Sequence, residues 1–368
     1  MTEPDASPSE GAASLRTIRR RLVVLLAVAL VLGLAAAGVV VARSGRQPPP
    51  STTKAVPVDV SCVTATYCVV VDDLGRAITY HDGAWSTPTH IDTNGLNTVS
   101  CPTTTFCLAA DDNGAVVRTV GQGRWSAPRA IDDLSVGKVS QDGLSSITVV
   151  SCATPDFCMA GDVLGRVNAF HGRKRTPFAP IEHLVKTRLS LEKAVTGLDC
   201  VTTTFCAAVT DRGQALVWEG EGWMAGHELV SLSAAYTAQA RLRSTIADVS
   251  CTSSSFCVAV NPTGVAYTYD GTSWSSGTVM DRGATAAGDG VGVTAVSCAA
   301  RTCVAVDDSG KVARYDGTSW SAPRLVDPTL GLATVSCATP TFCVALNDIG
   351  EALLYNGSTW SAPRTVDH

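Results

Sequence analysis

Fourteen cysteines have the most distinctive chemistry in this 368-residue chain, because thiols bind metals, exchange electrons or form disulfides. They fall into seven close pairs, six spaced C-x5-C and the sixth in order spaced C-x4-C. Zinc sites typically use pairs two to four residues apart with further ligands, whereas the six histidines here are scattered. The pairs are Cys62 and Cys68, Cys101 and Cys107, Cys152 and Cys158, Cys200 and Cys206, Cys251 and Cys257, Cys298 and Cys303, and Cys337 and Cys343.

Each cysteine pair lies within one predicted hairpin, where facing positions of antiparallel strands approach disulfide geometry. We therefore predict seven structural disulfides, in preference to metal or redox sites. Closing a loop of seven residues contributes about 2.4 kcal/mol in the chain-entropy model. Because disulfides persist in oxidising compartments, the prediction places this part of the chain outside the cytoplasm.

Two other repeated residue types allow further chemistry. Asp-Asp-x-Gly turns begin at Asp72, Asp111 and Asp307. Each offers few of the six to eight oxygens that calcium requires, so we interpret them as turns capped by their own carboxylates. Tryptophans recur at one fixed position in six of the seven repeated units that contain the cysteine pairs. This recurrence favours packing between neighbouring units over sugar stacking. Phe178 is the expected substitute in the third unit. The tryptophans are Trp85, Trp125, Trp223, Trp274, Trp320 and Trp360.

Enzyme signatures are absent from the sequence. It contains no G-x-S-x-G, H-E-x-x-H, Walker or dinucleotide-binding motif. We therefore expect no cofactor and favour a protein that is not an enzyme. The alternative is an exported hydrolase or lyase acting at a central funnel, with His183 or His227 as a loop histidine.

The elements that carry the cysteines form a repeat of 39 to 51 residues. A glycine stands seven residues after every second cysteine, and Asp-Gly or Asn-Gly hairpin signals follow in several repeats. Each unit predicts four short strands, so the fold class is all-β, a seven-bladed β-propeller with four-stranded blades. Blades start near residues 57, 97, 147, 195, 246, 293 and 332. Blade 7 is expected to pack on blade 1 with little strand exchange.

The patterns VSC-x5-C-VAVDD-x-G and YDGTSWSAP resemble a β-propeller repeat common in exported and membrane-anchored proteins of actinobacteria. The resemblance covers residues 57–368 and implies a fold, without a reaction or a known ligand. The D-G-x-x-W turn also resembles the Asp-box hairpin of sialidase-type propellers, but it lacks the usual Asp-x-Gly spacing.

An apolar segment precedes the repeats. Residues 22–42 carry no charge, and as a helix they would be about 31 Å long, enough to cross a hydrocarbon core of about 30 Å. The arginine-rich side, residues 16–21, predicts a cytoplasmic N-terminus. We expect a cytoplasmic disordered tail (1–21), a single transmembrane helix (22–42), a Pro-rich linker (43–56) and an extracytoplasmic propeller (57–368). A cleaved signal peptide is the alternative for the apolar segment.

Insertions between blades are the expected recognition surface. First cysteines are 39, 51, 48, 51, 47 and 39 residues apart, so the joins from blade 2 to blade 6 are long and emerge on one face. Five of the 28 basic and three of the 33 acidic residues precede Ser44, so residues 44–368 carry a net charge of −7. This charge argues against nucleic acid as the partner. We predict a binding or sensory module for an anionic cell-envelope polymer, a partner protein or a small ligand. The candidate residues are Arg173, Lys174, Arg175, His183, Lys186, Arg188, Lys193, His227, Arg241 and Arg243.

Overall fold

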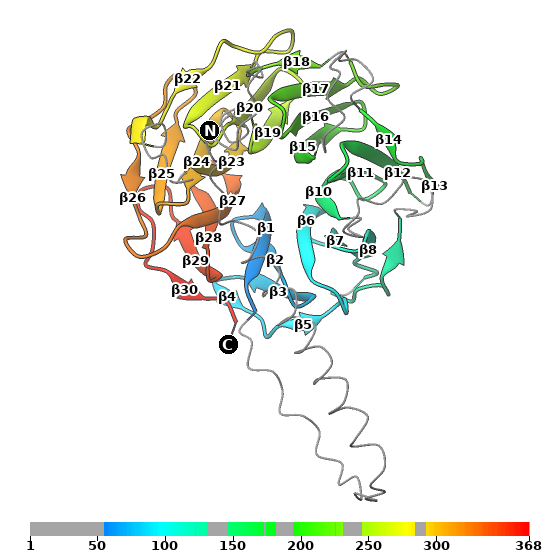
Figure 1. Ribbon diagram of the computed structural model, residues 1–368. Coiled ribbons are helices and arrows are strands. Elements are labelled where there is room, and N and C mark those ends of the chain that lie inside the picture. The colour runs from blue at the N-terminus through cyan, green and yellow to red at the C-terminus, as the bar shows by residue number, and fades with distance from the viewer. Residues whose placement is uncertain are drawn as a thin grey trace, which may run out of the picture. The chain divides into compact units, whose positions relative to one another are not determined.

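Seven antiparallel sheets surround a central axis in the computed structural model, which confirms the predicted seven-bladed β-propeller (Figure 1). The structure describes residues 55–121, 123–131, 146–172, 174–181, 194–224, 226–230, 245–283 and 292–367. The predicted span 22–42 lies outside this part of the chain. Within the described ranges, no helix has the length and apolarity to cross a bilayer.

Each blade is built from consecutive strands of one repeat. Blade 1 contains β1 (Pro57–Thr64), β2 (Tyr67–Asp72), β3 (Arg76–His81), β4 (Ala84–Trp85) and β5 (Thr89–His90). Blade 2 contains β6 (Leu96–Thr103), β7 (Phe106–Asp111), β8 (Ala115–Arg118) and β9 (Arg129–Ala130). Blade 3 contains β10 (Ile147–Thr154), β11 (Phe157–Asp162), β12 (Arg166–His171), β13 (Lys174–Arg175) and β14 (Ala179–Pro180). Blade 4 contains β15 (Val195–Thr202), β16 (Phe205–Thr210), β17 (Gln214–Trp218) and β18 (His227–Glu228).

The last three blades follow the same order. Blade 5 contains β19 (Asp248–Ser253), β20 (Phe256–Val260), β21 (Val265–Tyr269) and β22 (Thr278–Val279). Blade 6 contains β23 (Val293–Ala299), β24 (Thr302–Asp307), β25 (Lys311–Tyr315) and β26 (Arg324–Leu325). Blade 7 contains β27 (Leu332–Thr339), β28 (Phe342–Asn347), β29 (Glu351–Tyr355) and β30 (Arg364–Thr365). The fourth strand of every blade is short, and in blades 1 and 3 it consists of two pieces that both pair with the third strand.

A disulfide joins the two innermost strands of every blade. In blade 7, for example, Cys337 of β27 faces Cys343 of β28 in the register, as the C-x5-C spacing predicts. The Cα atoms of the seven bonded pairs are 3.9 to 4.1 Å apart. The predicted pairing within each hairpin is therefore confirmed for all fourteen cysteines.

The turn between the second and third strands explains the repeated aspartate and glycine. The Asp72 carboxylate accepts hydrogen bonds from the backbone N–H groups of Leu74 and Arg76, at 3.0 and 2.8 Å. Gly75 has a positive φ of 74°, and a Cβ there would lie 2.3 Å from the Asp92 carbonyl oxygen. Residues other than glycine rarely adopt this backbone conformation, so the turn requires glycine. The glycine at the equivalent position of every repeat has a positive φ.

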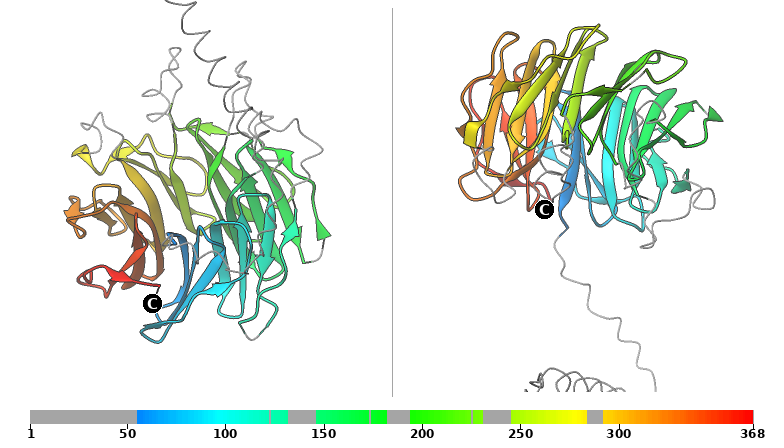
Figure 2. Two further views of the ribbon diagram at one scale, coloured as in Figure 1. Left: turned by 60° about the horizontal axis from the view of Figure 1, so that its bottom comes forward. Right: turned by 45° about the horizontal axis from the view of Figure 1, so that its top comes forward.

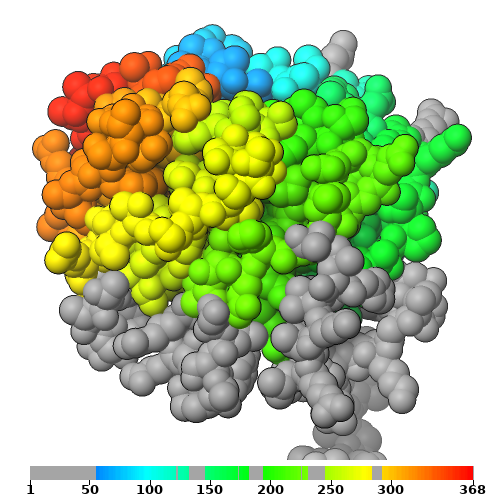
Figure 3. All heavy atoms as spheres, turned by 90° about the horizontal axis from the view of Figure 1, so that it is seen from above, coloured from blue at the N-terminus to red at the C-terminus, as the bar shows by residue number. Residues whose placement is uncertain are grey.

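Seven apolar clusters hold the ring together, and each lies between two neighbouring blades. Val60 of β1, for instance, packs with Val344 and Leu346 of β28. Each cluster also contacts the tryptophan of one blade or, between blades 2 and 3, Phe178. The interpretation of the tryptophans as packing residues is therefore confirmed. Figure 3 shows neighbouring blades lying tightly against one another at the rim.

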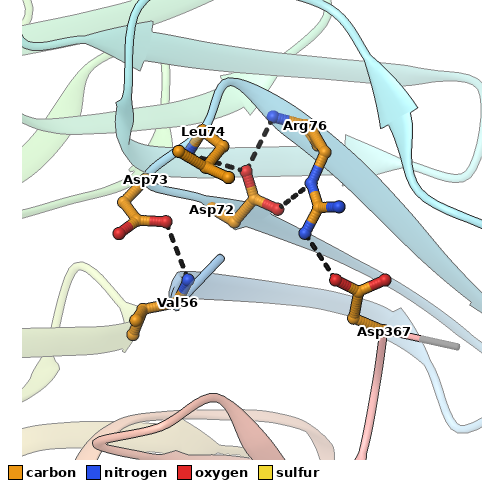
Figure 4. Close-up of polar contacts among 6 residues, drawn as sticks. All are labelled: Val56, Asp72, Asp73, Leu74, Arg76 and Asp367. Atoms are coloured by element: carbon orange, nitrogen blue, oxygen red, sulfur yellow. Dashed lines mark hydrogen bonds and ion pairs between the residues drawn. The ribbon is translucent and has the colours of Figure 1, made fainter. Parts of the chain in front are cut away.

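Blade 7 meets blade 1 without exchanging a strand, as predicted, because β27–β30 form one sheet and β1–β5 another. Side-chain contacts close this joint. Arg76 lies between Asp72 and Asp367 and binds both carboxylates, at 2.6 and 2.7 Å (Figure 4). Within blade 1, the Asp73 carboxylate accepts a hydrogen bond from the Val56 N–H, at 2.7 Å, which holds the start of β1 against the turn after β2. In the turned views of Figure 2 the C-terminal segment accordingly lies beside the first strands of blade 1.

Candidate functional site

The innermost strands of the seven blades line a central channel with a cavity of about 320 Å³. Most of its lining consists of valine, alanine, serine and threonine side chains. Three acidic residues interrupt this lining: Asp59 of β1, Asp199 of β15 and Asp248 of β19. No lysine, arginine or histidine belongs to the described lining, so the acids have no basic neighbour there.

A ring of hydrogen bonds passes from blade to blade at the level of the disulfides. The residue before each first cysteine uses its side-chain oxygen to accept a hydrogen bond from the N–H of the first cysteine in the next blade. Serine does this in six blades and Asp199 in blade 4. The pairs are Ser61 with Cys101, Ser100 with Cys152, Ser151 with Cys200, Asp199 with Cys251, Ser250 with Cys298, Ser297 with Cys337, and Ser336 with Cys62, at 2.7 to 3.0 Å.

A second layer of inter-blade hydrogen bonds lies two residues earlier on the innermost strands. One carboxylate oxygen of Asp59 accepts from the Val99 N–H of blade 2, at 2.8 Å. One oxygen of Asp248 accepts from the Val296 N–H of blade 6, at 3.0 Å. The other oxygen of each carboxylate accepts from the N–H of the residue that follows it, at 2.8 Å. Both acids therefore connect neighbouring blades.

Burial raises the pKa values of these three carboxyl groups. Desolvation raises the pKa of Asp59 to about 6 and that of Asp199 to about 6, while backbone hydrogen bonds act in the opposite direction. The pKa of Asp248 is raised further, to about 7, because the charges of Asp199 and Asp59 add to its desolvation. The three carboxyl groups thus hold their protons more tightly than free aspartates do.

The channel combines features of a binding cavity and of an acidic site. Its hydroxyl and apolar lining is typical of binding, whereas three carboxyl groups with raised pKa values are typical of acid–base chemistry. The observed hydrogen bonds give these acids a role in joining blades. Among the described residues, no group of three or more His, Cys, Asp or Glu is arranged to hold a metal ion.

Sequence reasoning missed these acids, although one signal was present. Position 199 carries aspartate where the other six repeats carry serine, directly before the first cysteine. Asp59 and Asp248 stand three residues before their cysteines, where the other repeats carry threonine, valine, glycine or alanine. Aligning the seven repeats would have singled out all three.

The structure places only three of the predicted recognition residues. Lys174 and Arg175 form β13, and His227 belongs to β18; all three are exposed. β13 pairs with the end of β12 next to their hairpin, whereas the join to blade 4 begins after Ile181, at the other end of the blade. Lys174 and Arg175 therefore lie opposite the face with the long joins. The remaining predicted residues lie outside the described ranges: Arg173, His183, Lys186, Arg188, Lys193, Arg241 and Arg243.

No protein-family model matches this chain, and no curated protein sequence matches it. Solved structures do. The β-propeller domain of Myceliophteria thermophila Cps50 (Swd1) is 8% identical with a TM-score of 0.61, over 82% of this chain and 97% of that one. YCF48 bound to D1 peptide is 15% identical with a TM-score of 0.58, over 83% of this chain and 93% of that one. The WD40 β-propeller domain of Doa1 is 12% identical with a TM-score of 0.53, over 83% and 91%. At these identities the likeness establishes a shared fold, the β-propeller.

Proposed function

We propose that this chain is a membrane-anchored, extracytoplasmic binding or sensory module whose propeller binds a peptide, a protein or an anionic cell-envelope polymer. The observation that carries the proposal is the disulfide in every blade, because such bonds persist in oxidising compartments and make the ring a rigid scaffold. A propeller of similar fold, YCF48, has been solved with a bound peptide. The repeat pattern further supports membership of the actinobacterial family of exported propellers that it resembles.

The anchor in this proposal is residues 22–42, and the linker 43–56 with its three consecutive prolines is the spacer. A reporter enzyme fused after Asp367 is expected to be active only when it requires export. A reporter that requires the cytoplasm, fused at the same position, is the control. Activity of the cytoplasmic reporter would contradict both the topology and the location.

The partner is proposed to bind the face with the long joins, as an anionic cell-envelope polymer or an acidic protein surface. Lys186, Arg188 and Lys193 lie in the join between blades 3 and 4. Changing these three residues to glutamate should weaken partner binding about tenfold, and added salt should mimic the loss, because exposed charges are screened over about 8 Å in physiological salt. The matched control changes Arg324 and Arg364, which are exposed on β26 and β30, two fourth strands that no long join follows.

The measurement is crosslinking of the full chain in its native envelope, followed by quantitative mass spectrometry of the attached molecules. The proposal expects the join variant to lose a partner that the control variant keeps. Equal recovery with both variants would show that the partner binds elsewhere. A variant with this join shortened is limited to residues 182–193, since Lys174–Ile181 contains β13, β14 and a buried isoleucine.

A hydrolase or lyase acting at the channel is the second candidate, and the raised pKa of Asp248 favours it. The variant Asp248→Asn keeps an oxygen acceptor for the Val296 N–H, loses the acceptor for the Val249 N–H and removes the titrating group. If the protein is an enzyme, this change should abolish turnover of any substrate found for it. If it is a binding module, partner recovery should remain unchanged.

A further inference from the structure

Aromatic rings fill the joints between blades in a repeated arrangement. In three joints a phenylalanine of one blade stacks on a tyrosine of the next, at 6.0 to 6.2 Å between ring centroids. The tryptophan of that next blade lies against the same tyrosine, at 5.1 to 5.4 Å. The three sets are Phe342, Tyr80 and Trp85; Phe205, Tyr269 and Trp274; and Phe256, Tyr315 and Trp320.

The joint between blades 2 and 3 has two of these rings and an arginine in the third place. Phe106 and Phe170 occupy the positions of the first two rings, and Phe170 pairs with Arg175 in the register, as Tyr80 pairs with Trp85. The Arg175 guanidinium does not fill the space of an indole but donates a hydrogen bond to the Ile131 carbonyl oxygen, at 2.5 Å. Phe178, the substitute expected from the sequence, packs on the same cluster under the Arg166 guanidinium instead.

A pocket of about 190 Å³ opens at this joint. Its walls include the rings of Phe106 and Phe170 and the side chains of Leu108, Val116 and Ile131, the last three of which are buried. This volume is below the roughly 300–1,000 Å³ of pockets that take drug-sized ligands, so it suits a single side chain. Aromatic walls prefer an aromatic guest, because offset and edge-to-face ring contacts are favourable.

The charge at the pocket is the reverse of the charge of the domain. Three exposed arginines belong to its lining, Arg118, Arg129 and Arg175, against one acid, Asp156. The chain after Ser44 carries a net charge of −7. Guanidinium groups bind carboxylates in planar, charge-assisted contacts, so the rim selects for negative charge next to the ring.

We propose that this pocket binds an aromatic side chain of a partner polypeptide, flanked by acidic residues. The inference rests on the proposed function, and it assigns that function a site in the joint between blades 2 and 3. The arginine substitution in blade 3 creates the site: six repeats supply their own tryptophan at this position, and the third takes a ring from the partner.

The test is calorimetric titration of the full chain in detergent micelles with a peptide of sequence Ac-Glu-Asp-Trp-Asp-Glu-NH2. Arg175→Trp restores the residue of the other repeats and should fill the pocket. We expect this variant to bind the peptide at least tenfold more weakly than the wild type and to melt at a higher temperature. Arg324→Trp, which adds an indole at an exposed arginine of β26, should bind like the wild type.

Two control peptides and one further variant complete the test. Replacing the peptide tryptophan by alanine, or its acids by lysine, should each weaken binding at least tenfold. The double variant Arg118→Glu and Arg129→Glu alters exposed residues only, so it reports on the site even if Arg175→Trp fails to fold, and it should favour the lysine peptide. Equal binding by wild type, Arg175→Trp and the double variant would overturn the proposal, as would no binding to the wild type.

One outcome would reassign the occupant. If only a variant shortened within residues 132–145 binds the peptide, this chain's own segment after Ile131 occupies the pocket, and the proposal for a separate partner is wrong. Failure of this site and failure of the proposed function are distinguishable. If wild type and Arg175→Trp crosslink equally to an envelope partner and neither binds the peptide, the site alone is refuted. If the peptide binds specifically but the reporter is active in the cytoplasm, the extracytoplasmic role alone is refuted.

Discussion

Replacing Asp199 by serine should stabilise the protein at high pH and leave it almost unchanged at low pH. Asp199 accepts the Cys251 N–H hydrogen bond at 2.7 Å, in the place where a serine hydroxyl accepts the equivalent bond in the other six joints. The serine variant therefore keeps an acceptor for Cys251 and removes a carboxyl group whose charged form is poorly solvated in the channel wall. The other six blades show that the ring accommodates serine at this position.

The magnitude follows from the pKa of Asp199, which is raised from 3.8 to about 6. A difference of about two units corresponds to about 3 kcal/mol, and partial contact with channel water reduces this to about 1–3 kcal/mol. Between pH 4 and 6 the folded protein binds more protons at this group than the unfolded chain does. The free energy of unfolding therefore falls as pH rises through this window and stays low above it. The serine variant lacks this loss of stability with rising pH. It should also have a lower pKa at Asp248, because the charge of Asp199 is one of the causes that raise that pKa.

The assay is urea unfolding of the full chain in micelles at pH 4, 6 and 8, with the disulfides intact. The variant is expected to gain about 1–3 kcal/mol at pH 8 and close to nothing at pH 4. Ser61→Asp, at the equivalent position of blade 1, is the matched control and should lose stability at pH 8 only. A loss of stability of equal size at pH 4 and pH 8 in the Asp199→Ser variant would refute the desolvation argument and point to packing.

Two further predictions concern how the ring is held. Ser336→Ala and Ser297→Ala should each reduce the free energy of unfolding by about 1–2 kcal/mol, because each leaves one partly buried N–H without its acceptor. A much larger effect at Ser336 would show that the joint of blades 7 and 1 is weaker than the others. Non-reducing peptide mapping of the full chain should recover seven links, each between the two cysteines of one blade, and an abundant link between blades would contradict the register that pairs Cys62 with Cys68.

Much of the fold is predictable from the sequence because the signals repeat seven times. A single C-x5-C pair is ambiguous, but seven pairs with a glycine always seven residues later define one hairpin and one turn. The Gly350 turn shows the physical reason, since its φ of 78° and its close approach to Pro57 admit glycine alone.

The sites were less predictable, because they depend on departures from the repeat and on contacts between repeats. Arg175 was read as part of a basic loop, yet its register next to Phe170 places it at the position of a tryptophan in a joint. Aligning the repeats singles out Asp199 as a departure from serine, but its partner, the Cys251 N–H of the next blade, is known only from the structure. Pairwise contacts between residues about 50 positions apart leave little trace in local composition.

The joint of blade 7 with blade 1 contains the two kinds of contact found at the other six joints, an apolar cluster and a hydrogen bond from a cysteine N–H to a side-chain oxygen, and the Arg76–Asp367 ion pair in addition. The described chain also begins and ends in these two adjacent blades, at Ala55 and Asp367. The contacts between blades therefore do not depend on which blade comes first in the chain, and new termini placed in any long join would leave every joint with the contacts that it has now. The position of the termini is then independent of the fold, and a circular permutant that begins at blade 4 should form the same seven-bladed ring.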